Sequence, residues 1–515
     1  MSHHPTHETP DTIRAVVDEQ AARHGDATYV LEVRGPRLIT YDSLAAKTRS
    51  WRTTLSALGV NGGARVGLVV ADPLDFSEAF ISLLAAGMWV APLDPSESLG
   101  TGEQIAQRSE TLDLELIISD RPSPHERHVR WHDMYACPTP EDVTSLSTTD
   151  FDATRGGVLL SSSGTTGTPK VMALPISQLL HAATLVARHN QLTPTERGMN
   201  PLPLWHINAE VVGLLATLVS GASLALDDRF HRTGFWTLVD SLDVTWINAV
   251  PAIIARLVAL QEDETAPARV RFIRSASAPL APALLRQFEE ATNIRVIESY
   301  GMTEAASQIC VNPLDARKIG SVGRPVGVEL RVRPLEETAP GHVDPFVVGH
   351  VEIRGRSIIT HYEANGYEDR FDADGWLRTG DLGYLDDEGY VFLVGRSDDV
   401  INRGGEKIFP REIEDAVLAL AGVRACAVVG APDEVYGQVP VLFVQFDDAG
   451  GTSSRDDMLI AVKEIHDLIV SSFARTRRPV SINVVEHFPS HATGKIQKRF
   501  LTSGSVPVLV EHRVR

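Results

Sequence analysis

Apolar positions alternate between strand and helix periods along the first 300 residues, which predicts a parallel α/β arrangement. Residues 65–72 form an apolar run typical of a buried strand, residues 74–87 have helical spacing, and Trp89–Pro92 is a second short apolar run. Strand, helix and strand in this order form a βαβ unit. Further expected elements are a first helix capped by Asp11, strands at 114–119, 223–226, 244–249, 270–275 and 294–298, and helices at 177–190, 209–219, 251–261 and 281–291.

After about residue 320 the pattern becomes irregular and rich in glycine, with short β segments. We therefore expect an α/β fold: a large N-terminal domain of two α/β sheet subdomains plus a small β-barrel-like subdomain, followed by a small α+β domain. The expected bounds are 1–396 for the N-terminal domain, about 320–396 for its β-rich subdomain and 397–515 for the C-terminal domain, in which helices are expected at 410–420 and 456–472 and strands near 424–429 and 440–446.

Length and charge narrow the classes of function. With 515 residues, the chain exceeds what one hydrophobic core usually holds. Its formal net charge of -19 argues against broad binding to nucleic acids or anionic membranes. An anionic substrate would need a local positive site against this field.

Cysteine usage and the termini suggest a compartment. Cys137, Cys310 and Cys426 are widely spaced and odd in number, which suits a reducing cytoplasm and gives no disulfide or zinc pattern. The polar N-terminus lacks the apolar core of a signal peptide, and no apolar run is long enough to span a bilayer. We expect a cytoplasmic protein without nucleic-acid or membrane partners, as a monomer or a homodimer.

One loop stands out between apolar segments. The segment Leu159–Leu174 contains a run of small hydroxyl residues and glycines, and this run ends at Lys170. Gly164 and Gly167 let the chain turn without a Cβ clash, and a nest of N–H groups and hydroxyls binds anions such as a triphosphate. Lys170 is neither preceded by Gly nor followed by Ser or Thr, so this is not a Walker A loop and the metal ligand must lie elsewhere. A flexible surface loop is the alternative interpretation.

Four further stretches carry candidate chemistry. Ser-Tyr-Gly-Met-Thr-Glu at 299–304 follows a strand, where ligands bind in α/β sheets, and Glu304 offers an oxygen to Mg²⁺. Leu-Arg-Thr-Gly-Asp at 377–381 ends in a carboxylate that can accept two hydrogen bonds from a ribose. The other two stretches are glycine-rich 395–414 and 489–498. Taken singly, such residues are more typical of turns, helix ends or solvated surface.

Together and in this order, the five stretches resemble the adenylate-forming superfamily: acyl-CoA synthetases, peptide-synthetase adenylation domains and luciferases. Phe272–Pro282, Ile401–Phe409 and Ala492–Lys498 are most similar to oxalate–CoA ligases and other small-acid CoA ligases. The resemblance covers nearly the whole chain. It implies that ATP, Mg²⁺ and CoA take part and that the C-terminal domain is mobile.

The resemblance also implies roles for single residues. Lys495 would bridge the substrate carboxylate and the α-phosphate, Glu304 would bind Mg²⁺, and Asp398 would be the hinge. The implied phosphate contacts are Ser163, Gly164, Thr165, Thr166, Gly167 and Lys170 at the β- and γ-phosphates and Thr303 at the α-phosphate. Around adenine and the ribose they are Ser277, Ala278, Pro279 and Tyr300, then Asp381 and Arg396, with the adjoining Ser299, Gly301 and Met302. Gly404 and Gly405 would line the channel for the pantetheine thiol.

The chemistry explains these residue types. A carboxylate must approach the α-phosphorus of ATP while both are negative, and Mg²⁺ and Lys495 would offset the repulsion and stabilise the transition state. A thiol then attacks the mixed anhydride. Because the two half-reactions need different groups at one carbon, a hinge rotation that exchanges Lys495 for Gly404 and Gly405 is implied.

The acyl pocket is expected around Leu204–Glu210. His206, with Thr303 and Lys495, is a candidate catalytic residue, and a packed core histidine is its alternative. Neither residue after His206 is Asp, which weighs against amino-acid activation. Asn208 and Glu210 are candidate substrate residues. Glu210 in the pocket would favour a polar, hydroxylated or amino-bearing acid over a long fatty acid; the alternative is that it points to solvent or caps the following helix.

The leading hypothesis is an ATP-dependent acid–CoA ligase that forms an acyl-adenylate and acts on a small, possibly aromatic, organic acid. A diazotase, in which ATP activates nitrite for attack by an aryl amine, is a second hypothesis that Glu210 keeps open. A non-catalytic nucleotide-binding scaffold is a third hypothesis. The intact residues Lys170, Glu304, Asp381, Arg396 and Lys495 argue against it. The sequence leaves open the acid, the acceptor, the oligomeric state and the pathway.

Overall fold

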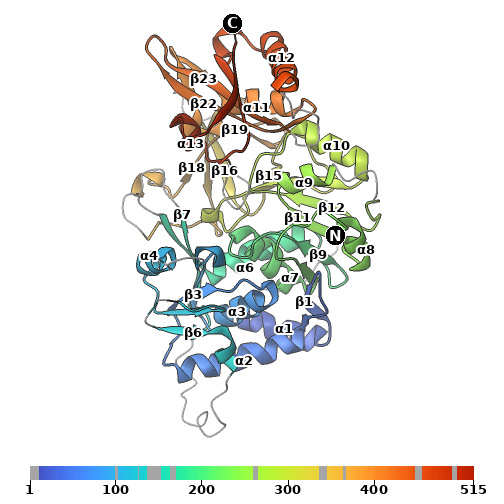
Figure 1. Ribbon diagram of the computed structural model, residues 1–515. Coiled ribbons are helices and arrows are strands. Elements are labelled where there is room, and N and C mark those ends of the chain that lie inside the picture. Colours follow the sequence, from blue (N-terminus) through green and yellow to red (C-terminus); the bar gives the residue numbers. More distant parts are fainter. Residues whose placement is uncertain are drawn as a thin grey trace.

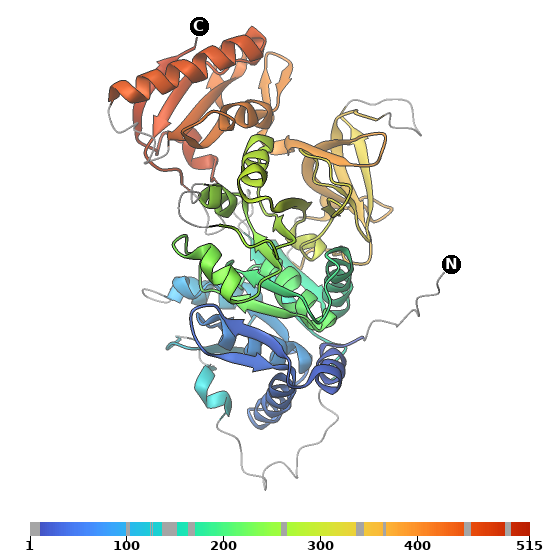
Figure 2. The ribbon, with the colours of Figure 1, turned by 90° about the vertical axis from the view of Figure 1, so that its right-hand side faces the viewer.

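The computed structural model describes residues 11–98, 103–123, 125, 127–135, 152–162, 170–258, 265–335, 345–363, 367–446, 455–489 and 496–514. Within these ranges the strands form four sheets. In Figures 1 and 2 the chain runs from its blue N-terminal elements at one end of an elongated molecule to its red C-terminal elements at the other.

The first sheet is built around the predicted βαβ unit. β3 (Arg65–Val69) and β4 (Trp89–Pro92) are parallel and joined by α3 (Pro73–Ala85). Asp72 caps α3 by accepting hydrogen bonds from two backbone N–H groups of the first turn, both at 3.0 Å. The strand order is β6 (His128–Arg130), β5 (Leu116–Ser119), β3, β4, β7 (Gly157–Ser162) and β8 (Lys170–Pro175), and α4 (Glu103–Leu112) precedes β5.

The second sheet has nine strands in the described part of the chain and carries much of the predicted site. It is parallel from β13 to β1, as the alternating pattern predicts. Its order is β15 (Arg324–Pro325), β14 (Cys310–Val311), β13 (Arg295–Tyr300), β12 (Phe272–Ser275), β11 (Trp246–Ala249), β9 (Arg197–Asn200), β10 (Ser223–Leu226), β1 (Thr28–Glu32) and β2 (Leu38–Thr40). The helices of this region are α2 (Tyr41–Ala57), α6 (Ile176–His189), α7 (Ala216–Ser220), α8 (Phe235–Ser241), α9 (Pro251–Val258) and α10 (Pro282–Thr292).

Two local expectations are corrected. Thr12, not Asp11, caps α1 (Ile13–His24), because the Thr12 hydroxyl accepts a hydrogen bond from a first-turn N–H group at 3.1 Å. The helix expected at 209–219 begins as a wider π-type turn, η3 (Ala209–Leu215), before it continues as α7. Such wide turns are frequent at functional sites.

The β-rich region is a four-stranded antiparallel sheet. Its strands follow the order β16 (Glu329–Pro334), β17 (Gly349–Arg354), β18 (Leu377–Leu385) and β19 (Val391–Arg396). In Figure 2 this yellow-to-orange sheet lies to one side of the green elements of the second sheet.

The C-terminal residues form a separate α+β unit with its own apolar core. The sheet order is β21 (Glu406–Ile408), β20 (Ile401–Arg403), β23 (Gly437–Phe446), β24 (Ser481–Val485) and β25 (Val508–Arg513), with β22 (Val423–Asp433) paired to β23, and the helices are α11 (Pro410–Leu418), α12 (Arg455–Ser472) and α13 (Arg499–Thr502). Arg411 of α11 contacts the N-terminal part by donating from Nη1 to the Leu393 carbonyl at 3.0 Å. The chain thus has a large N-terminal and a small C-terminal part, and a boundary between residues 396 and 397 stays a prediction.

None of the helices in the described part of the chain combines the length and the apolar character that a bilayer span requires.

Candidate active site

A buried carboxylate joins the second sheet to the β-rich sheet. Asp381 accepts a hydrogen bond from Arg396 Nη1 at 3.0 Å and another from the Tyr300 hydroxyl. Tyr300 ends β13, while Asp381 and Arg396 are register partners on β18 and β19. Burial, and then the charge of Asp381, raise the pKa of Tyr300 well above its usual value, so the hydroxyl stays protonated and donates. Three predicted nucleotide residues are therefore brought together.

The predicted metal ligand and the predicted phosphate lysine share one aromatic neighbour. Glu304, buried in η4 (Thr303–Ala305), accepts a hydrogen bond at Oε1 from the Tyr362 hydroxyl at 2.8 Å. The Nζ atom of Lys170 lies 5.6 Å from the Tyr362 ring centroid and 5.1 Å from that of Tyr367. Tyr362 therefore connects Lys170 to Glu304.

Charges of both signs gather around Lys170. Burial lowers the pKa of its ammonium group, and the Arg370 guanidinium lowers this pKa further. Glu304 acts on the Lys170 pKa in the opposite direction, and Arg396 and Asp398 act on it more weakly. Lys170, Arg370 and Arg396 therefore supply the local positive site that an anionic substrate needs in this acidic protein.

Two glycines allow close approach in this region. A Cβ at Gly301 would lie 1.6 Å from the Ser307 carbonyl oxygen, so the Tyr-Gly-Met-Thr-Glu turn requires glycine for packing. Gly380 has φ 81°, and a Cβ there would lie 2.9 Å from Arg396 Nη2 and 3.1 Å from Arg370 Nη1. Gly380 thus leaves room for both guanidinium groups beside Asp381.

The predicted acyl residues lie on and just before η3. Asn208 accepts a hydrogen bond at Oδ1 from Asn248 Nδ2 at 2.7 Å, and the same Nδ2 lies 2.9 Å from Asn200 Oδ1. The backbone N–H of Glu210 donates to the His206 carbonyl at 3.2 Å. These contacts anchor the segment to β9 and β11.

The alternative that Glu210 points to solvent or caps the following helix is wrong. Its side chain is completely buried, and neither carboxyl oxygen has a hydrogen-bond partner among the described residues. Burial raises the pKa of Glu210 well above its ordinary value, because an unpaired carboxylate is costly in an apolar interior. Burial therefore favours the neutral form of the Glu210 carboxyl group, and its contact with substrate remains a prediction.

The other predicted residues divide into described and undescribed ones. Gly404 and Gly405, with φ 60° and 96°, form the exposed two-residue turn between β20 and β21, a conformation that explains glycine at both positions. Asp398 is exposed in η6 (Ser397–Asp399). Ser277, with φ 71°, and Pro279 are exposed in the turn after β12, Ala278 is half-buried there, and Met302 and Thr303 are half-buried around η4. The expectations for Ser163, Gly164, Thr165, Thr166, Gly167 and Lys495 lie outside the described residues.

Sequence analysis missed Tyr362, Tyr367 and Arg370. All three belong to the connection between β17 and β18, where no motif marks them. Arg370 is the residue that most clearly adds positive charge beside Lys170. No sequence motif could have identified these residues, since the contacts of Tyr362 and Tyr367 with Glu304 and Lys170 arise only in the folded chain.

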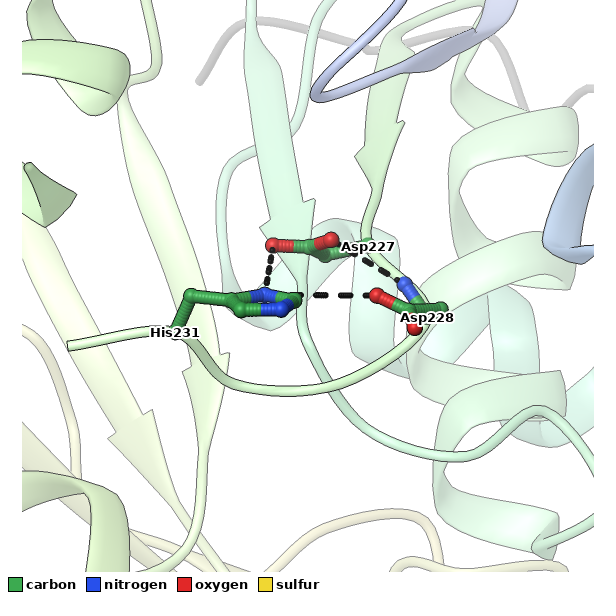
Figure 3. A group of neighbouring side chains, drawn as sticks. All are labelled: Asp227, Asp228 and His231. Atoms are coloured by element: carbon green, nitrogen blue, oxygen red, sulfur yellow. Dashed lines mark hydrogen bonds and ion pairs between the residues drawn. The ribbon is translucent and has the colours of Figure 1, made fainter. Parts of the chain in front are cut away.

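A second group of acidic residues follows β10 (Figure 3). The Nδ1 atom of His231 lies 3.3 Å from Asp227 Oδ2 and 3.9 Å from Asp228 Oδ1, and Arg34 Nε lies 3.5 Å from Asp227 Oδ2. Although these ligand atoms are close enough to hold a cation, Asp227 already has two ion-pair partners. The group is explained as an ion-paired cluster.

Comparison with known proteins agrees with this geometry. The model of the AMP-binding enzyme family matches residues 17–363, and that of the AMP-binding enzyme C-terminal domain matches residues 412–495. A protein of Cupriavidus necator named sulfoacetate–CoA ligase is 34% identical and covers 95% of this chain and 97% of its own. The oxalate–CoA ligase of Arabidopsis thaliana is 31% identical and covers 95% of this chain and 98% of its own.

Solved structures show the same fold. An anthranilate CoA ligase in complex with anthranoyl-AMP has a TM-score of 0.83 at 23% identity and covers 96% of this chain and 97% of its own. The o-succinylbenzoate CoA synthetase of Bacillus subtilis, in complex with its acyl-adenylate intermediate, has a TM-score of 0.80 at 24% identity, covering 94% and 97%. The chain therefore belongs to the AMP-binding enzyme family, as an acid–CoA ligase of the AMP-forming kind.

Proposed function

We propose that the protein activates a small organic acid as its acyl-adenylate, with release of pyrophosphate, and transfers the acyl group to the thiol of CoA. The observation that carries this proposal is the convergence of Lys170, Glu304 and Arg396 beside Asp381, because it gathers phosphate-binding and ribose-binding groups around one place. Relatives that match over most of the chain are named for small acids, sulfoacetate and oxalate.

Different described residues bind different parts of the nucleotide. Asp381, oriented by Arg396 and Tyr300, accepts hydrogen bonds from the ribose hydroxyls. Lys170 and Arg370 attract the outer phosphates. Orientation of Asp381 by two donors matters, because a fixed acceptor loses little conformational freedom when ATP binds.

Glu304 fits a magnesium site. Its carboxylate is held by Tyr362 and lies within the electrostatic reach of Lys170, which is where the phosphates of ATP would lie. A carboxylate oxygen is the ligand type that Mg²⁺ takes together with substrate phosphates. Magnesium supplies positive charge that offsets the repulsion between the acid and ATP.

The two alternative functions gain no support. The relatives of this chain are named CoA ligases, and none of the names reported above concerns nitrite or aryl amines. Glu210 kept the diazotase hypothesis open, but its carboxyl group is buried, and burial raises its pKa, which favours the neutral form and does not single out an amine.

A turnover experiment tests the proposal. Purified protein is given ATP, Mg²⁺ and single acids from a panel, and pyrophosphate is measured with and without CoA. Acid-dependent pyrophosphate release that accelerates with CoA and yields an acyl-CoA supports the proposal. Release that requires nitrite and an aryl amine, or ATP binding without pyrophosphate for every acid, contradicts it.

A further inference from the structure

Three buried polar side chains lie side by side under the acyl segment. Asn248 on β11 is the register partner of Arg274 on β12, and the pairing of β11 with β9 places Asn200 beside Asn248. Register partners point to the same face of a sheet, so all three side chains share one face. None of the three has any exposed surface.

Arg274 uses only part of its guanidinium group. Its Nε donates to the Ser299 hydroxyl oxygen at 3.1 Å. Its Nη1 and Nη2 atoms are buried and have no hydrogen-bond partner within the described residues. By contrast, Arg271 at the start of the same segment donates to Glu196 Oε2 and to the Asn190 carbonyl. A purely structural arginine would be expected to satisfy its terminal nitrogens in the same way.

Burial of an unpaired cation costs folding free energy, so an unpaired buried arginine indicates a role other than stability. Burial lowers the pKa of Arg274 to about 9, which still leaves the guanidinium protonated at neutral pH. The neighbouring Asn248 Oδ1 also has no partner among the described residues. The unsatisfied terminal N–H groups of Arg274 indicate a place that a ligand with acceptor oxygens completes, whereas the Asn248 oxygen needs a donor.

This place adjoins both predicted subsites. Ser299, which holds Arg274, is directly followed by Tyr300, which holds Asp381. Asn248, which lies beside Arg274, donates to Asn208 two residues after His206. Consecutive Cα atoms are only about 3.8 Å apart, so the Arg274 and Asp381 contacts lie at the same end of β13, although successive side chains of a strand point to opposite faces.

We propose that Nη1 and Nη2 of Arg274 bind a second anionic group on the acid substrate, so that the enzyme selects short dianionic acids. This inference rests on the proposed function. The planar guanidinium presents two parallel N–H donors to a carboxylate or a sulfonate. The bound anion supplies the negative charge that the described hydrogen-bond partners of Arg274 do not provide. An uncharged tail of the same shape would leave the buried cation unpaired and would bind poorly.

The test compares each dianion with an uncharged-tail isostere of the same shape. Oxalate, malonate and succinate are paired with oxamate, malonamate and succinamate, and sulfoacetate with methylsulfonylacetate, which distinguishes a carboxylate from a sulfonate. We expect the best dianion to exceed its isostere by about 100-fold in kcat/KM, and Arg274→Met to reduce this ratio to about threefold. Arg274→Lys keeps one cation without the planar pair and should give an intermediate ratio. Arg295→Met, an exposed arginine at the start of β13, should keep the wild-type ratio.

A binding measurement separates this inference from the proposed function. With a non-hydrolysable ATP analogue present, the best dianion should raise the melting temperature of the wild type and not that of Arg274→Met. Without acid, Arg274→Met should melt no lower than the wild type, because the substitution removes an unpaired buried charge. Dianion-specific stabilisation without any pyrophosphate release would sustain the inference and refute the ligase activity. Equal turnover or equal stabilisation with dianions and isosteres, or a ratio unchanged in both Arg274 variants, would overturn it.

Discussion

Asp381 and Arg396 face each other as register partners across β18 and β19, with 3.0 Å between Asp381 Oδ1 and Arg396 Nη1. The pair is joined by the Tyr300 hydroxyl from a different sheet. A carboxylate with two fixed donors keeps one geometry, which is the property a ribose-binding group needs. The contact therefore ties the end of the parallel sheet to the last hairpin before the C-terminal part.

Replacement of Asp381 by Asn should weaken nucleotide binding through the ribose. We expect Asp381→Asn to lower AMP affinity by about 10- to 100-fold, since hydrogen bonds to a charged acceptor are the stronger ones. The affinity for 2′,3′-dideoxy-AMP should change little. Calorimetric titration measures both, with exposed Asp387→Asn as the matched control on the same hairpin. Equal losses for both nucleotides would remove the ribose from the role of Asp381.

Replacement of Glu304 by Gln should shift the magnesium requirement. The amide keeps the contact with Tyr362 but lacks the charge, so half-maximal pyrophosphate release should need about 10-fold more Mg²⁺. A magnesium titration at saturating ATP measures the shift. Glu290→Gln, an exposed substitution on α10, serves as the control. An unchanged magnesium curve in Glu304→Gln would place the metal elsewhere.

ATP affinity should fall at alkaline pH because of Lys170. The charged ammonium binds phosphate, and burial with Arg370 nearby lowers its pKa below that of a free lysine. The attraction is therefore present below the lowered pKa and lost as the pH rises through it. Lys170→Arg keeps its charge and should flatten this decline when ATP dissociation constants are measured from neutral to alkaline pH. Identical slopes in the two proteins would exclude Lys170 as the titrating group.

Glu298 should make the fold less stable as the pH rises. Burial raises its pKa from 4.5 to about 7, with Arg411 opposing this shift and Asp415 favouring it. Because the folded state holds the proton more tightly, the stabilising contribution is complete below pH 4.5 and is lost by about pH 7. Glu298→Gln should therefore gain roughly 3 kcal/mol in unfolding free energy relative to the wild type over this window.

Denaturant titrations at several pH values measure that gain for Glu298→Gln. Glu290→Gln, whose side chain is exposed, should give a curve parallel to the wild type. A Glu298→Gln curve that is also parallel would show that Glu298 titrates alike in the folded and unfolded chains.

The periodic pattern predicted several strands of the two largely parallel sheets, because β3, β4 and β10 are mostly apolar. It missed β9, whose residues Arg-Gly-Met-Asn lack such a run and are buried by the sheet around them. The wide turn η3 was read as an ordinary helix, since its residues are apolar on every side. Tertiary packing, which a local pattern does not encode, decides both cases.

The resemblance to the adenylate-forming superfamily, and not a local pattern, predicted that Tyr300, Glu304, Asp381 and Arg396 belong together, and Asp381 does contact Tyr300 and Arg396. Sequence comparison could not identify residues that stand out only through unsatisfied polar atoms or complete burial in the fold. Arg274 lies in the Phe272–Pro282 segment that resembles oxalate–CoA ligases, but only its unpartnered terminal nitrogens in the fold distinguish it from a structural arginine. Glu210 likewise required the structure to show complete burial.

The products of ATP test the central account most directly. Wild-type protein with ATP, Mg²⁺ and its best acid, without CoA, should accumulate an acyl-adenylate detectable by mass and release one pyrophosphate for each adenylate. Added CoA should convert it to acyl-CoA and AMP, and Lys495→Ala should bind ATP yet form no adenylate. Formation of ADP and phosphate, or full adenylate formation by Lys495→Ala, would contradict the account.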